Sequence, residues 1–87
     1  MFTVTEAASA YLAQILAEKH SSQGIVIRYL LIGETLTPQL DMIHPGDATF
    51  DYGGKTVLAL DKPLAERLAD NTLDLKVSRD GSHLRLR

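Results

Sequence analysis

The residues of this chain whose types could support chemistry are few, and the best set surrounds His44. Asp41 precedes His44 by three residues, and Asp47 follows it by three. One imidazole nitrogen and two carboxylates can form a mixed nitrogen and oxygen site for a divalent metal. However, side chains alternate along a strand, so Asp41 and His44 would point to opposite faces. We therefore interpret His44 first as a strand-end residue beside Met42, and keep the metal site of His44, Asp41 and Asp47 as an alternative.

Other kinds of site have less support. The sequence contains no cysteine, which excludes disulfides and thiolate metal sites. His20 suits the negative end of a helix, and His83 suits a solvent-facing strand position, so we expect neither to bind metal. No nucleophile stands beside a base and an orienting acid in a recognisable motif. We expect no enzyme activity and no cofactor.

Charge excludes two further classes of partner. Nine Lys and Arg against eleven Asp and Glu give a formal net charge of −2, so no bulk positive field attracts nucleic acid or anionic lipid. A small group of basic side chains lies near the C-terminus: Lys76, Arg79, Arg85 and Arg87. Such a group is more typical of a solvated strand face than of a nucleic-acid site. We expect neither nucleic acid nor a membrane as a partner.

The elements that position these residues fit one small domain. The 87 residues are 45% hydrophobic and 23% charged, a globular balance, so residues 1–87 are expected to form a single domain. The longest apolar run, Ile25 to Ile32, is broken by Arg28 and is far shorter than the ~20 residues of a membrane-spanning helix. Residues Met1 to Glu6 carry no basic stretch followed by an apolar one, so we expect a cytoplasmic protein.

The first half of the chain predicts one helix and two strands. Thr5 can cap a helix from about Glu6 to Lys19, in which apolar residues recur at three- and four-residue spacing. Ile25 to Ile32 is typical of a buried strand. Gly33 to Pro38 is interpreted as a loop, and Leu40 to His44 as a half-buried strand.

The second half predicts two hairpins around a short helix. Residues Tyr52 to Lys55 contain two glycines that suit a tight turn, and Asp61 can cap a helix from about Lys62 to Ala69. In the last hairpin, Asp80 and Gly81 are interpreted as the two turn residues.

That turn fixes a register for the last hairpin. Val77 would face Leu84, and Lys76 would face Arg85. One face would then be apolar, while the other would carry like charges and should lie in water.

This order of elements and several local strings resemble the HesB/IscA-like family of iron–sulfur carrier proteins. Phe2 to Ala8 resembles the family's opening strand and helix cap, and Gly24 to Arg28 its glycine-led strand. Leu40 to Met42 lies where the family commonly has a leucine, an acidic residue and an aromatic one. Tyr52 to Asp61 resembles its middle hairpin, and Leu68 to Leu75 resembles its L-D-G-T-x-L-D-F/Y segment.

The resemblance implies a fold more firmly than an activity. It implies an α+β domain in which mixed, mostly antiparallel strands form a barrel-like sandwich with two helices. The family's first cluster cysteine would lie around Gly33 to Leu36, where no soft ligand is present. Its other two cysteines belong to a Cys-Gly-Cys tail, and the sequence ends at Arg87, about where that tail would begin. Clusters are held mainly by cysteine thiolates, so we expect this chain to bind none.

Three hypotheses about function follow. The first is a cysteine-less relative that binds a protein partner as an accessory to iron–sulfur cluster biogenesis, with Gly33, Glu34 and Leu36 as the candidate partner loop. The second is the divalent-metal site at His44. The third is a small-ligand-binding domain that reuses the region from Gly33 to Pro38. Assembly of the chain into a homo-oligomer is an open alternative.

Overall fold

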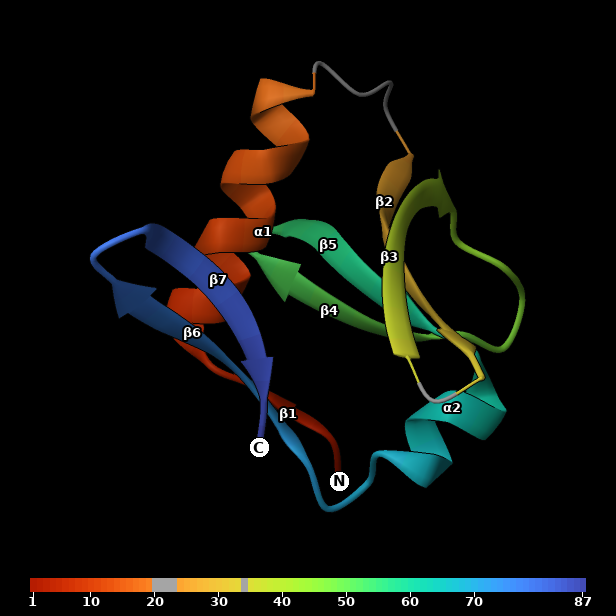
Figure 1. Ribbon diagram of the computed structural model, residues 1–87. Helices are drawn as coiled ribbons and strands as arrows, with labels where there is room; N and C mark the ends of the chain where they lie inside the picture. The colour runs from red at the N-terminus through yellow and green to blue at the C-terminus, as the bar shows by residue number, and fades with distance from the viewer. Residues whose placement is uncertain (20–23, 34) are drawn as a thin grey trace.

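The computed structural model describes residues 1–19, 24–33 and 35–87, which fold into two sheets and two helices (Figure 1). In chain order the elements are β1 (Thr3–Val4), α1 (Glu6–Glu18), β2 (Ile25–Ile32), β3 (Thr35–Met42), β4 (Ala48–Tyr52), β5 (Lys55–Leu60), α2 (Lys62–Arg67), β6 (Thr72–Ser78) and β7 (Gly81–Leu86). One sheet has the order β1-β6-β7 and the other the order β3-β2-β5-β4. Pairing is parallel between β1 and β6 and between β2 and β5, and antiparallel elsewhere. This mixed, sandwich-like arrangement confirms the predicted α+β fold class.

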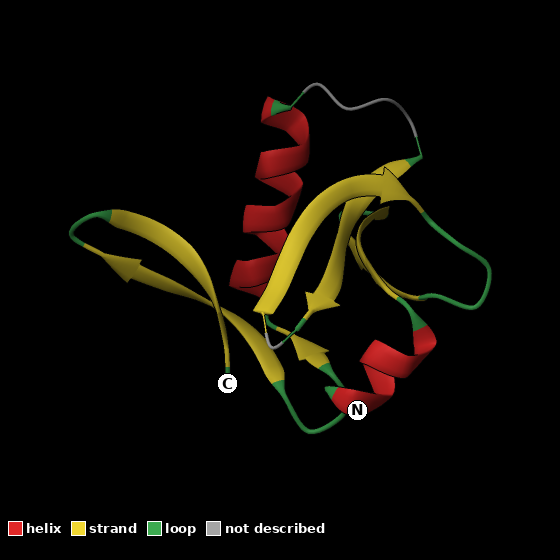
Figure 2. Cartoon of the chain, turned by 45° about the vertical axis from the view of Figure 1, so that its right-hand side comes forward, coloured by secondary structure: helices red, strands yellow, loops and turns green. Residues whose placement is uncertain are grey.

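Helix α1 begins where the sequence predicts. The Thr5 hydroxyl oxygen accepts a hydrogen bond from the Ala8 N–H at 3.2 Å, which satisfies one of the free donors of the first turn. Leu12 and Leu16 are fully buried, and the helix contacts β2, β4, β5 and β6, so it packs on strands of both sheets. Figure 2 shows α1 with the C-terminal hairpin on one side and the four-stranded sheet on the other. The helix therefore forms a central part of the core.

The core joins the two halves of the chain. Its buried members lie in α1, β2, β5, α2 and β6, just before β1 and just after α2: Phe2, Ala8, Leu12, Leu16, Ile27, Tyr29, Val57, Leu58, Leu60, Leu64, Leu68 and Leu73. Phe2 and Phe50 meet edge to face, with ring centroids 5.5 Å apart. The prediction that β2 forms the buried strand beside α1 is confirmed by Ile27, which is 3% exposed.

The connection after β2 is shorter than predicted. β3 already begins at Thr35, and Tyr29 pairs with Pro38, so the predicted loop over residues 33–38 is wrong for residues 35–38. Pro38 is tolerated because β3 is an edge strand, where a missing N–H costs little. The predicted strand over residues 40–44 is also too long, because the chain turns after Met42 and the Asp47 N–H donates to the His44 carbonyl at 3.1 Å.

The middle hairpin and the second helix follow their local signals. Gly53 and Gly54 form the turn between β4 and β5 with φ angles of 61° and 80°, as predicted. The Asp61 carboxylate accepts from the Leu64 N–H at 2.8 Å and caps α2, which ends at Arg67, two residues before the predicted end. No helix in the described part of the chain has the length and apolar character needed to cross a membrane.

The register predicted for the C-terminal hairpin is wrong by two residues. Val77 pairs with Ser82, Leu75 with Leu84 and Lys76 with His83. Gly81, with φ at 119°, is the first residue of β7, so the two turn residues are those just before it.

Long-range contacts explain this register, because they fix the far end of the hairpin. The backbone N–H groups of Thr72 and Arg87 donate to each other's carbonyls at 2.9 and 2.8 Å, and the Asn71 side chain donates to the Arg87 carbonyl at 2.9 Å. A shift of two residues keeps every side chain on its predicted face. Val77 is left 73% exposed at the hairpin tip.

Candidate functional site

The place where the family resemblance implies a first cluster cysteine is the turn between β2 and β3. Gly33 is exposed there, while Leu36 is half-buried and packs against the core. Glu34, the third member of the candidate partner loop, lies outside the described residues, as does His20. Because the chain has no cysteine, Gly33 and Leu36 offer no side-chain ligand to a cluster. The exposed apolar side chain beside this turn is Ile32, which is 62% exposed.

The structure separates the members of the candidate metal site. His44 Nε2 lies 3.4 Å from Asp41 Oδ2, so the prediction that these two side chains point apart is wrong. The alternation rule does not apply because the strand ends at Met42, before His44. Asp47, in contrast, is engaged elsewhere. In the described ranges, no three His, Asp or Glu side chains gather closely enough to hold a metal ion.

Asp47 forms a buried ion pair with Arg28, which the sequence analysis missed. Arg28 Nη2 and Nε donate to the two carboxylate oxygens at 2.9 and 3.4 Å, and the side chains are 6% and 2% exposed. Asp47 Oδ2 also accepts from the His44 N–H at 2.8 Å. The pair therefore anchors the turn over residues 44–47 to the middle of β2.

Opposing effects set the protonation of this pair. Burial alone would raise the pKa of Asp47, but the hydrogen bonds from Arg28 and from the His44 N–H outweigh it and hold the pKa below its usual value. The residue in the sequence that could have predicted this buried pair is Arg28 itself. An arginine inside an otherwise buried strand requires a carboxylate partner, because an unpaired buried charge is costly.

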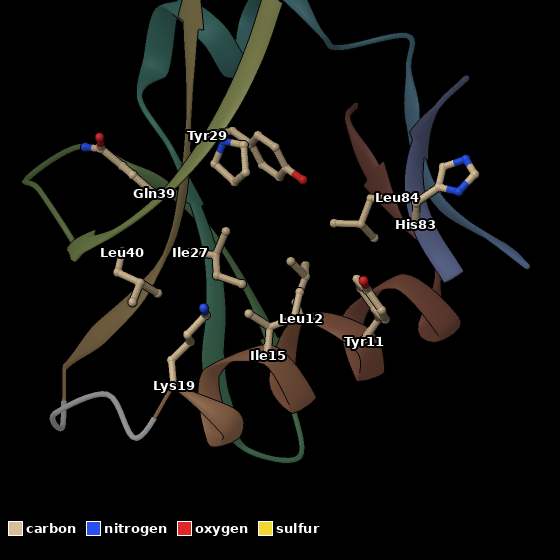
Figure 3. Close-up of a pocket in the computed structure, with 11 residues that line it drawn as sticks. Tyr11, Leu12, Ile15, Lys19, Ile27, Tyr29, Gln39, Leu40, His83 and Leu84 are labelled. Carbon is tan, nitrogen blue, oxygen red and sulfur yellow. The ribbon is translucent and has the colours of Figure 1, made fainter. Parts of the chain in front are cut away.

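A pocket of about 380 Å³ lies between α1, the β2–β3 hairpin and β7 (Figure 3). Its lining comes from four elements and one helix cap: Tyr11, Leu12 and Ile15 of α1, Lys19 at the C-cap of α1, Ile27 and Tyr29 of β2, Pro38, Gln39 and Leu40 of β3, and His83 and Leu84 of β7. The pairs Ile27 with Leu40 and Tyr29 with Pro38 place apolar groups side by side on the face of the hairpin that meets the helix. This volume is within the range of small-molecule sites.

The polar groups of the pocket are sparse. Figure 3 shows the Lys19 side chain reaching toward Ile27, the Tyr29 hydroxyl pointing toward Leu84, and the His83 ring turned away on the other side of β7. The Tyr11 hydroxyl donates to the Ser82 carbonyl at 3.2 Å. Burial raises the pKa of the Tyr29 phenol, and Tyr11 adds to the shift, so this hydroxyl stays neutral. Lys19 is thus the charged group that reaches into the pocket.

The basic group at the C-terminus lies in water, as predicted. Arg85 and Arg87 lie 3.7 and 3.4 Å from Asp74 Oδ2, and both arginine side chains are about half exposed. His83 is exposed on the same face. The pKa of Asp74 is lowered, first by the hydrogen bond from the Leu75 N–H and next by that from the Thr5 hydroxyl, with the arginines contributing less. This face contains ordinary solvated charges.

Comparisons with known proteins identify the fold. No family model and no curated protein matches the sequence. SufA of Escherichia coli, involved in biosynthesis of iron–sulfur clusters, matches with a TM-score of 0.70 at 16% identity, over 99% of this chain and 83% of SufA. IscA with a [2Fe-2S] cluster matches with a TM-score of 0.64 at 21% identity, over 100% of this chain and 84% of IscA. A solution structure of a protein from Aquifex aeolicus matches with a TM-score of 0.65 at 20% identity, over 99% of this chain and 89% of the Aquifex protein.

These matches span nearly the whole chain, so the described strands and helices have the same fold as SufA and IscA. More narrowly, the chain has the HesB/IscA-like fold, which confirms the resemblance at the level of structure. It has this fold without any of the cysteines that the resemblance implies.

Proposed function

We propose that this chain is an accessory protein of iron–sulfur cluster biogenesis, which binds a protein partner in the cytoplasm, catalyses no reaction and holds no cluster itself. One observation carries the proposal: the fold of SufA and IscA extends over the whole chain, whereas cysteine is absent. Because thiolates are the main ligands of such clusters, loss of the ligands with retention of the fold favours a role in protein contacts.

The surface that suits such a contact lies at the turn end of the β2–β3 hairpin. A hollow of about 420 Å³ between the end of β2 and α2 is lined by Leu30, Leu31, Ile32, Asp61, Pro63, Leu64 and Arg67. An exposed aliphatic side chain beside a polar rim is typical of a protein interface. The same end of the hairpin is where the resemblance implies a cluster ligand. A partner that carries or assembles a cluster would therefore meet Ile32 and Gly33.

Binding to purified cluster-assembly proteins of the same host tests this proposal. We expect at least one scaffold or carrier protein to bind the immobilised chain in biolayer interferometry. The variant Ile32→Asp should weaken that binding by about tenfold or more, because it puts a charge into the apolar contact.

Val77→Asp is the matched control, because Val77 is equally apolar and even more exposed, but lies at the tip of the other hairpin. It should leave binding unchanged. Failure of every cluster-assembly protein to bind would refute the proposed function. Equal losses of binding with both variants would refute the assignment of the docking surface to the turn end of the β2–β3 hairpin.

A further inference from the structure

The pocket beside Lys19 combines a long apolar wall with one cation, and the proposed partner role does not use it. We propose that it binds a medium-chain carboxylate, with the aliphatic chain along α1 and the carboxylate at the Lys19 amino group. This inference is independent of the proposed function, because the pocket belongs to the isolated chain.

The walls suit an aliphatic chain. Leu12, Ile15, Ile27, Leu40 and Leu84 contribute branched aliphatic groups from four elements. If each CH₂ group takes roughly the 30 Å³ that a water molecule occupies in the liquid, the pocket holds roughly a dozen such groups. Burial of each CH₂ is favourable by about 0.8 kcal/mol, so a chain of this length supplies most of the affinity.

The charges select the head group. Lys19 has no ion pair within the described ranges, and no carboxylate is among the residues that line this pocket. The neutral Tyr29 phenol adds no negative charge. Lys19 is exposed to solvent, and an incoming carboxylate would meet its ammonium group and no carboxylate of the pocket lining.

Two other hollows of the molecule lack this combination. The hollow beside Phe2 contains Asp47 and Glu66 together with Lys62, and the hollow beside Ile32 contains Asp61 together with Arg67. In both, carboxylates of the protein oppose an anion. An amphipathic carboxylate should therefore prefer the pocket of α1, β2, β3 and β7.

Titration with decanoate, followed by ¹⁵N–¹H NMR below its micelle concentration, tests the proposal. We expect saturable shifts of the amides of Ile15, Ile27 and Leu84. Decanol, which has the same chain without the charge, should bind at least about tenfold more weakly than decanoate. Decylamine, whose charge is positive, should bind more weakly still. Lys19→Met keeps the apolar stem and removes the charge, so it should abolish the preference for decanoate over decanol.

The matched control is Lys76→Met, which removes an exposed lysine outside the pocket and should keep the preference. Ile15→Trp fills the pocket and should abolish binding of both probes while the chain stays folded. The proposal is overturned if decanoate causes no saturable shifts, or if Lys19→Met keeps the preference. Binding to phosphatidylglycerol vesicles without binding of free decanoate would place the affinity on a membrane surface and also overturn it.

Discussion

Two regions of this molecule use an aspartate with arginine in different ways. Arg28 of the four-stranded sheet and Asp47 of the turn before β4 form a two-point contact almost fully removed from water. At the C-terminal hairpin, Asp74 meets Arg85 and Arg87 at longer distances on an exposed surface. Burial, and not the residue types, therefore decides how much the fold depends on such a pair.

Removal of Asp47 should produce the largest effect. Asp47→Ala leaves the Arg28 guanidinium buried without a partner, which should cost about 3 to 5 kcal/mol in the free energy of unfolding. Urea denaturation followed by circular dichroism measures it. Arg85→Ala, which breaks an exposed contact, should change the same quantity far less. Similar losses in the two variants would contradict the larger contribution of the buried contact to stability.

Truncation of the core between α1 and β2 should have an effect of similar or slightly smaller size. Leu12→Ala or Ile27→Ala should cost about 2 to 5 kcal/mol through lost burial and the cavity that remains. Val77→Ala, at an exposed position of the hairpin, is the control and should be nearly neutral. Denaturation with EDTA present should give the same values, because the core needs no metal. A chain that unfolds in EDTA would contradict this.

The pH dependence of stability should report on the buried pair. The folded pKa of Asp47 lies below its ordinary value of 3.8, so its contribution is present above that pH and is lost as the pH falls toward the folded pKa. Between about pH 6 and about pH 3, the free energy of unfolding should therefore fall more steeply for the wild type than for Asp47→Asn. Parallel curves of the free energy of unfolding against pH would mean that protonation of Asp47 is not coupled to folding.

The smallest expected effect concerns Thr5, which links the start of α1 to Asp74 in the exposed cluster of Asp74, Arg85 and Arg87. Its hydroxyl oxygen accepts from the Ala8 N–H, and its hydroxyl donates to Asp74 Oδ1 at 3.1 Å. Thr5→Ala should cost about 1 kcal/mol through the lost cap and raise the pKa of Asp74. Carboxylate NMR titration measures the pKa. Thr5→Ser, which keeps the hydroxyl, should retain both properties.

Local signals sufficed for much of the fold. Thr5, the apolar spacing of α1, the Gly53–Gly54 turn and the Asp61 cap are each decided within a few neighbouring residues, and the structure confirms them. The errors arose where a distant partner decides. Pro38 lies in a strand because it pairs with Tyr29, and the last hairpin takes its register from the contacts between Arg87 and Thr72.

The candidate sites were harder to predict for the same reason. The pocket combines Lys19 and Ile15 with Tyr29 and Leu84, residues that no short motif connects. Asp47 was considered only with its neighbours Asp41 and His44, whereas its main partner is Arg28 in another strand. By contrast, the absence of thiolate ligands is a property of composition and needed no structure.

Anaerobic reconstitution of the purified chain with ferrous iron and sulfide tests whether this protein can hold a cluster. The readouts are the visible absorbance of a cluster and the sulfide retained after desalting. We expect neither cluster absorbance nor stoichiometric sulfide, because no cysteine is present to hold iron. A stable cluster at a fixed stoichiometry on the isolated chain would contradict it.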